Sequence, residues 1–259
     1  SSETIRDADQ GEMEYARWYG VTLNLPNGEI LHLGGRDENR SVSPTPEVFN
    51  AETGFRSLDD ATMVNFGGLA YFPHAWVNSK GDVILLEPSG REMYRMTTEG
   101  TGTYEKIGEY PFVSNAHMPS IMYEQDMVAR MANDGGLWVA NIAEDVPTWT
   151  RVAQMDKDRY DGGMVMLADG RIAVAGGSEG FLSLNNANKT IEVWDPRDNS
   201  VEILAEGAIE RLYHASEILL PDGTIFVGGG GATGPLNNTS FAIIAADCLY
   251  DEAGARANR

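Results

Sequence analysis

The sequence is poor in cysteine and in positive charge, and both shortages exclude something. Cys248 is the only cysteine among 259 residues, so no disulfide can form within the chain. Nineteen lysine and arginine residues stand against 39 acidic ones, which gives a formal net charge of −20. Nucleic acids and anionic membranes attract positive patches, so this charge argues against both as partners. Such acidity is typical of a solubilising surface and also fits a salty or extracellular setting.

Long apolar runs and helical periodicity are also missing. No apolar run approaches 18 residues, so no transmembrane helix is predicted. No long segment repeats its apolar residues every 3.6 positions, so helices should be scarce. The sequence begins with no signal peptide, but Ser1 is not a natural start, so a leader could already have been removed. These absences together favour an all-β protein.

What the sequence does contain is a repeated hairpin frame. Three stretches share it, residues 17–35 (RWYGVTLNLPNGEILHLGG), 159–177 and 211–231. Each begins with arginine and a nearby aromatic residue, turns through Asn-Gly or Asp-Gly, and ends in paired glycines. Two further units begin near 69 and 115, and a period of about 45 to 50 residues is typical of a four-stranded propeller blade. A β-sandwich shares the short alternating strands but does not predict three copies of one hairpin.

We therefore predict a β-propeller domain over residues 1–259, with about five four-stranded antiparallel blades that start near residues 17, 69, 115, 159 and 211. Residues 11–16 (GEMEYA) are expected to be the tail of an outer strand. The paired glycines are expected to let backbones approach at the end of the second strand. The recurring arginines indicate a packing role, such as an ion pair between blades. Because propellers close into a ring, the chain is expected to be a fragment of a longer polypeptide.

One repeat carries a phenol and an imidazole side by side. Tyr213 and His214 lie just before the first strand of the fifth unit, between Arg211 and the Leu-Pro-Asp-Gly turn at 220–223. With the GPLNN and CLYDEAG segments that follow, this frame resembles the galactose oxidase and glyoxal oxidase family of copper-radical oxidases. GEMEYARWYGVTLNLPNGEILHLGG resembles the blade of that family that carries the radical tyrosine. The resemblance extends over nearly the whole chain and implies a kelch-type propeller, part of a seven-bladed ring, in a secreted enzyme.

The resemblance also implies a copper site and a reaction. Tyr19 would be an equatorial ligand and the radical tyrosine, Tyr213 the axial ligand and general base, and His214 an equatorial imidazole. Such an enzyme oxidises a primary alcohol or a small aldehyde and reduces O2 to H2O2. The reaction moves two electrons while one copper ion cycles one, so a tyrosyl radical stores the other. Imidazole nitrogen and phenolate oxygen suit Cu(II).

The sequence departs from the family in four places. The cysteine that forms a thioether with the radical tyrosine lies upstream of it in the family, before this sequence begins. The second histidine ligand belongs to a C-terminal β domain that this sequence lacks. Asp37 stands where galactose oxidase has a tryptophan, and Ala245-Ala-Asp-Cys-Leu replaces Thr-Pro-x-Tyr-Leu. We therefore expect the isolated 259-residue chain to be inactive.

Each candidate residue also has a structural interpretation. A Tyr-His dipeptide is more often structural than catalytic, and Tyr19 by itself is more often core packing. His74 and His117 begin the second and third units and are kept as pocket lining, whereas His32 should be structural. In the fourth unit Asp161 and Gly162 take the place of the Tyr-His pair. Two function classes stay open, a copper-radical oxidase and a non-catalytic kelch module that binds a protein or a glycan.

Overall fold

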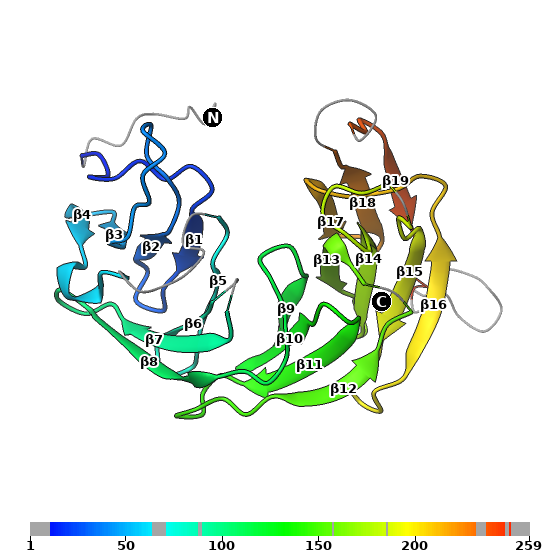
Figure 1. The fold of residues 1–259 in the computed structure, drawn as a ribbon, viewed down its shortest axis with the longest axis horizontal. Coiled ribbons are helices and arrows are strands. Elements are labelled where there is room, and N and C mark those ends of the chain that lie inside the picture. Colours follow the sequence, from blue (N-terminus) through cyan, green and yellow to red (C-terminus); the bar gives the residue numbers. More distant parts are fainter. Residues whose placement is uncertain are drawn as a thin grey trace. The chain divides into compact units, whose positions relative to one another are not determined.

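The computed structural model describes residues 11–63, 71–87, 90–156, 158–184, 186–231, 237–246 and 249 (Figure 1). Over these residues the backbone forms nineteen strands and one short 3₁₀ helix, Asp59–Ala61. The prediction of an all-β fold with almost no helix is therefore confirmed. None of the helical structure in this part of the chain is long and apolar enough to cross a membrane.

The strands form five antiparallel sheets in which neighbours in space are also neighbours in sequence. Blade 1 consists of β1 (Val21–Asn24), β2 (Ile30–Leu33), β3 (Glu47–Asn50) and β4 (Gly54–Ser57). Blade 2 consists of β5 (His74–Val77), β6 (Val83–Leu86), β7 (Glu92–Thr97) and β8 (Thr103–Glu109). Blade 3 consists of β9 (Ser120–Glu124), β10 (Met127–Met131), β11 (Gly136–Asn141) and β12 (Thr150–Gln154).

Blade 4 consists of β13 (Tyr160–Met166), β14 (Ile172–Ser178), β15 (Thr190–Trp194) and β16 (Val201–Glu206). Blade 5 has three strands within the described residues, β17 (Ala215–Leu219), β18 (Ile225–Gly229) and β19 (Phe241–Ile244). Four-stranded meanders of this kind are the blades of a β-propeller. The predicted kelch-type propeller is confirmed, and each predicted unit start precedes the first strand of a blade.

The chain divides into two compact units, and each is described by itself. The first holds residues 1–111 and 142–147 with blades 1 and 2, and the second holds residues 112–141 and 148–259 with blades 3 to 5. Within the first unit β1 lies beside β5, and within the second β13 lies beside β9 and β17. First strands therefore pack against first strands, as expected of the inner strands of a propeller. That residues 1–259 form one domain stays a prediction.

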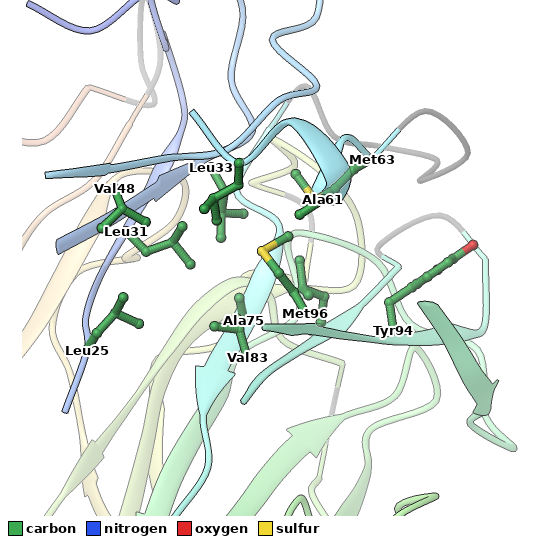
Figure 2. Packing of buried hydrophobic residues seen from close by; sticks show 12 residues of the cluster. Leu25, Leu31, Leu33, Val48, Ala61, Met63, Ala75, Val83, Tyr94 and Met96 are labelled. Atoms are coloured by element: carbon green, nitrogen blue, oxygen red, sulfur yellow. The ribbon is translucent and has the colours of Figure 1, made fainter. Parts of the chain in front are cut away.

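The core of the first unit follows from the two-residue alternation of its strands. In β2 Leu31 and Leu33 are fully buried, while the intervening His32 is only partly buried. They join Val83 and Met96 of blade 2 in one apolar cluster, and Figure 2 shows these side chains together. Burying each such side chain stabilises the fold by about 1.5–3 kcal/mol.

The paired glycines are required by close backbone approach. Gly35 and Gly177 have φ angles of +87° and +83°, which side-chain-bearing residues rarely adopt. A Cβ atom would lie 2.9 Å from Arg17 Cα at Gly35, and 2.8 Å from the Arg159 carbonyl carbon at Gly177. The predicted crowding at the end of the second strand is therefore confirmed.

Two strand predictions need correction. Residues 11–16 form no strand, because the amides of Glu14 and Tyr15 donate to the Glu47 carboxylate (2.6 and 3.4 Å) rather than to another strand. The apolar run 71–77 predicts a strand that starts at Tyr71, but β5 begins only at His74, directly after Pro73, which has no N–H to donate. The hairpin of blade 3 has a register shift between Met127 and Val128.

Candidate metal centre

The recurring arginine fastens the start of its own blade. Arg159 donates from Nη1 to the carbonyl oxygens of Gly176 (3.0 Å) and Thr190 (2.9 Å), and from Nη2 to Glu192 of β15. Arg17 and Arg211 donate to the equivalent carbonyls, those of Gly34 (3.0 Å) and Gly229 (2.8 Å). Each guanidinium thus links the residues before the first strand to the end of the second strand of the same blade, and in blade 4 also to the third strand. The expected ion pair between blades is wrong, because the acidic partner lies within the blade.

Directly after this arginine, the backbone makes the same turn in three blades. Each turn closes with an amide-to-carbonyl hydrogen bond, from Gly20 to Arg17 (3.1 Å), from Gly162 to Arg159 (2.9 Å) and from Ala215 to Leu212 (2.8 Å). The third residue of each turn is left-handed, with φ of 66° at Tyr19, 63° at Asp161 and 64° at His214. Side-chain-bearing residues adopt this conformation at a cost, and such residues cluster at functional sites. In blades 1, 4 and 5 the turn thus places one polar side chain at the start of the innermost strand.

In blade 5 the turn is displaced by one residue. Gly162 pairs with Gly176, and Ala215 pairs with Gly229, so Gly162 and Ala215 are equivalent. Arg159 precedes Gly162 by three positions, whereas Arg211 precedes Ala215 by four. Asp161 therefore corresponds to His214, and Tyr160 to Tyr213, which corrects the count made from the sequence. The additional residue is Leu212, which separates Arg211 from the Tyr213–His214 pair.

The side chains of Tyr213 and His214 lie against each other. Their rings are stacked, with centroids 3.7 Å apart and planes inclined by 28°. The rings of Phe181 and His117 lie 5.8 and 6.2 Å from that of Tyr213. His117 therefore lies beside the pair, and that it lines a pocket stays a prediction.

His117 is held in place by Asp161. The His117 Nδ1 lies 2.9 Å from the Asp161 carboxylate, whose side chain is 1% exposed. The same carboxylate accepts the amide of Leu182 (3.3 Å), and the Asp161 amide donates to the His117 carbonyl (2.9 Å). The carboxylate at Nδ1 fixes the orientation of the His117 ring. The sequence shows the polar residue at the turn position of blade 4, but not its partner.

Glu217 is a second acidic group that sequence reasoning missed. It lies in β17, three residues after His214, and faces Gly163 of β13 so closely that a Cβ there would stand 1.9 Å from its Oε2. Burial raises the pKa of Glu217 to about 7. Its Oε1 is buried and meets no hydrogen-bond partner among the described residues. An acidic residue within an otherwise apolar hairpin was the available signal.

Tyr19 lies in the first unit, among aromatic side chains. Its ring centroid is 4.3 Å from that of Trp18, 4.9 Å from Phe72 and 5.6 Å from Tyr71. Tyr19 is only partly buried, so it is not a core residue. Its convergence with Tyr213 and His214, which belong to the second unit, stays a prediction.

The remaining candidates occupy separate places. His74 begins β5 and lies 6.1 Å from Trp76 between ring centroids, while His32 Nδ1 is 3.2 Å from Thr22 Oγ1 on the neighbouring strand. Cys248 lies outside the described residues. Histidine, cysteine, aspartate and glutamate form no group of three suited to a metal ion in the described ranges. A centre at the Tyr213–His214 pair would therefore use phenol oxygen, and phenolate with imidazole is a donor set that fits Cu(II).

No family model matches the sequence. The chain is 26% identical over 258 residues to the aldehyde oxidase GLOX1 of Arabidopsis thaliana, with 82% of this chain and 40% of the relative covered. It is 23% identical over 256 residues to the aldehyde oxidase GLOX of Vitis pseudoreticulata, with 88% and 48% covered. A galactose oxidase of Gibberella zeae is 31% identical over 99 residues, which are 37% of this chain and 15% of that protein. The chain thus spans less than half the length of these relatives.

Solved structures show the same fold. A fungal alcohol oxidase of the AA5 family, described as having catalytic diversity and as being in complex with copper, superposes with a TM-score of 0.79 at 21% identity. The superposition covers 95% of this chain and 56% of that one. YjhT superposes with a TM-score of 0.64 at 12% identity, over 89% of this chain and 82% of that one. The resemblance predicted from the sequence is confirmed: the chain is similar in sequence to proteins named aldehyde oxidase and galactose oxidase and has the fold of an AA5 alcohol oxidase.

Proposed function

We propose that the protein is a secreted copper-dependent oxidase that converts a primary alcohol or a small aldehyde with O2 and releases H2O2. The observation that carries the proposal is the Tyr213–His214 pair, whose rings stack 3.7 Å apart at a turn with one additional residue. The likeness to proteins named aldehyde oxidase and galactose oxidase supports the same reaction class. Because the chain spans part of these relatives, the activity is assigned to the whole protein.

The proposed reaction balances without a further co-reactant. A primary alcohol loses two electrons and two protons and becomes an aldehyde. O2 takes up these two electrons and two protons and becomes H2O2. An aldehyde enters as its hydrate and leaves as the carboxylic acid. Bound copper would accept one of the two substrate electrons, and Tyr19, as a radical, would accept the other; O2 then takes up both. The radical role depends on the thioether cysteine that the resemblance places upstream of this sequence.

The chain's own residues take distinct roles in this proposal. His214 and Tyr213 hold the metal, and Tyr213 takes the substrate proton, which requires hydrogen-bond reach to the substrate hydroxyl. Asp161 positions His117 beside Tyr213 through the 2.9 Å contact at Nδ1. The residues that flank the pair thus come from blades 3 and 4 of the same unit, where β13 of blade 4 lies beside both β9 of blade 3 and β17 of blade 5.

The test measures peroxide release by the copper-loaded whole protein, not by the isolated 259-residue chain, on a panel of primary alcohols and small aldehydes. We expect turnover, its loss in His214→Ala and Tyr213→Phe, and its abolition in Tyr19→Phe. His32→Gln is the matched control, because His32 contacts Thr22 within blade 1 and should be dispensable. Electron paramagnetic resonance of bound Cu(II) should lose nitrogen coupling in His214→Ala but not in the control.

The outcome against the proposal is equally clear. Copper-loaded protein with no peroxide release on the whole panel, and with unchanged Cu(II) spectra in His214→Ala, would reject the assignment. It would favour the alternative of a non-catalytic kelch module that binds a protein or a glycan.

A further inference from the structure

Four aromatic rings gather before the first strands of blades 1 and 2. Trp18, Tyr19, Tyr71 and Phe72 form this aromatic patch, all within the first unit. Besides the contacts of Tyr19 given above, the Trp18 and Tyr71 rings lie 6.0 Å apart. The planes of the four contacting pairs are inclined by 69° to 89°. The rings therefore stand as walls at steep angles and do not form one flat platform.

Two residues of the patch have strained backbone conformations. Tyr19 has a φ of 66° and Phe72 a φ of 42°, and the Phe72 amide donates to the Tyr19 carbonyl (3.1 Å). A bulky residue at positive φ is an outlier that persists only where its surroundings impose it. Burial of the ring does not compensate for the backbone strain at Phe72, because Phe72 is 47% exposed. Trp18 and Tyr71 are also exposed, at 58% and 42%, so the patch faces outward.

The polar groups beside the patch are directed to their own loop. Trp18 and Arg36 exchange two backbone hydrogen bonds (2.8 and 3.0 Å), and the Arg36 guanidinium carbon lies 5.2 Å from the centre of the Tyr71 ring. Arg36 Nη1 donates to the Arg40 carbonyl. Asp37 Oδ1 accepts the amides of Asn39 and Ser41, at 2.9 and 2.7 Å.

This arrangement selects among ligands. A cationic ligand would meet the positive charge of Arg36, which already occupies the face of Tyr71. A sugar would need convergent hydrogen-bonding side chains, and the contacts of Arg36 and Asp37 instead serve the loop. A neutral planar ring can make edge-to-face and offset contacts with walls at these angles, with centroids 4.5–7 Å apart.

We propose that the aromatic patch binds the ring of an aryl-bearing primary alcohol or aldehyde and brings its reacting carbon to Tyr19. The inference rests on the proposed function for the reaction, because Tyr19 is the reacting phenol there. Binding of the ring does not depend on copper and can be measured separately.

The binding experiment uses copper-free protein, with benzyl alcohol as the probe and cyclohexylmethanol as its saturated match. Saturation-transfer NMR and calorimetry should show benzyl alcohol binding about tenfold more tightly, the factor expected for two aromatic contacts. Trp18→Leu and Phe72→Gly should each remove most of that preference. Phe55→Leu, in β4 of the same unit, is the matched aromatic control and should keep it.

The unfolding temperature separates a binding role from a structural one. Glycine relieves the strain at position 72, so Phe72→Gly should keep or raise the unfolding temperature while it loses the aryl preference. Equal affinity for the two alcohols, or stronger binding of methyl galactoside, would overturn the proposal. So would unchanged aryl binding in Trp18→Leu.

Peroxide release by copper-loaded protein then tests the link to the reaction. We expect kcat/KM for benzyl alcohol to fall about tenfold relative to that for 1-propanol in Trp18→Leu, whereas Phe55→Leu should leave both values within twofold. Aryl binding without turnover of any alcohol would retain the site but reject the proposed function. Turnover of 1-propanol without aryl preference would retain the function but reject the site.

Discussion

The charge of Glu217 depends on the fold. Its carboxyl group packs against Gly163, and desolvation by burial opposes ionisation more strongly than the positive charge of Arg211 favours it. The pKa of Glu217 is therefore raised to about 7, against 4.5 for an unperturbed glutamate. Between these two values the folded protein holds a proton that the unfolded chain has released.

We predict that this proton makes the free energy of unfolding fall as the pH rises. Below pH 4.5 Glu217 is protonated in the folded and in the unfolded protein, so the stability that the neutral carboxyl contributes is fully present. Between pH 4.5 and about 7 only the unfolded chain ionises at this residue, so this stability is lost as the pH rises. The loss is roughly 3 kcal/mol by linkage. Urea unfolding at pH 4.5 and 8 should show it in the wild type, and Glu217→Gln should remove it.

The exposed Glu105 provides the control for this measurement, because its side chain is 63% exposed. Glu105→Gln should leave the pH dependence as it is in the wild type. The same fall in Glu217→Gln as in the wild type would show that Glu217 is ionised in the folded protein.

At the scale of single residues, the sequence shows the candidate metal ligands but not the side chains that contact them. Tyr213 and His214 were found because they are adjacent and flanked by a familiar frame. The contact between His117 and Asp161 joins the segment before β9 to the start of β13, 44 residues apart, and no local pattern encodes it. The displaced turn of blade 5 was missed because counting from Arg211 assumes a constant spacing, which only the strand pairing disproves.

Two buried ion pairs hold the starts of blades 1 and 4. Arg17 and Glu47 are joined at 2.8 Å with side chains 4% and 1% exposed, and Arg159 and Glu192 are buried to a similar degree. Desolvation by burial lowers the pKa of both arginines, although the carboxylates oppose it. In blade 5 the carbonyl of Ser240 accepts from Arg211 instead (2.7 Å).

We predict that Glu192→Ala lowers the free energy of unfolding by about 3–5 kcal/mol, because it leaves Arg159 charged, buried and without its counterion. Replacing both partners, as Arg159→Met with Glu192→Leu, should recover much of the loss. Guanidinium unfolding of the single and double variants measures both effects.

The exposed pair of Lys106 and Glu109 serves as the control. Glu109→Ala should change the free energy of unfolding by less than about 1 kcal/mol. An equally small loss in Glu192→Ala would mean that water or another group compensates Arg159.

At the scale of elements, the hairpins were predictable and their long-range partners were not. Asn-Gly and Asp-Gly turns between apolar runs mark the first two strands of blades 1, 4 and 5. The recurrence of arginine indicated a common role, but a repeat does not say whether the partner lies in the same blade or the next. Only the position of Glu192 in β15 resolves that choice.

Over the whole molecule the charge is strongly unbalanced. The formal net charge is −20 and the isoelectric point is about 4.4. Repulsion among like charges destabilises a compact state, and salt screens it over about 10 Å at 0.1 M.

We predict that raising NaCl from about 20 to 300 mM stabilises the protein by about 1 kcal/mol, a rise in unfolding temperature of about 2–4 °C. Differential scanning calorimetry at neutral pH measures it. Choline chloride at equal ionic strength should give the same shift if screening is the cause. A lower unfolding temperature at high salt would contradict the prediction.

The period of the repeat predicted the blades because each blade is a local meander. The placement of Tyr19 relative to Tyr213 and His214 depends instead on contacts across about 190 residues of sequence, which spacing does not encode. That part of the candidate centre therefore still rests on the resemblance.

The left-handed turn shared by blades 1, 4 and 5 has an evolutionary consequence. Its hydrogen bond joins backbone atoms, so the turn does not prescribe the side chain at its third position, which is tyrosine, aspartate and histidine in the three blades. A point mutation there exchanges the reactive group of a blade while the backbone hydrogen bond stays in place. New chemistry can thus be acquired blade by blade, while the hydrogen-bonded frame that carries it is inherited unchanged.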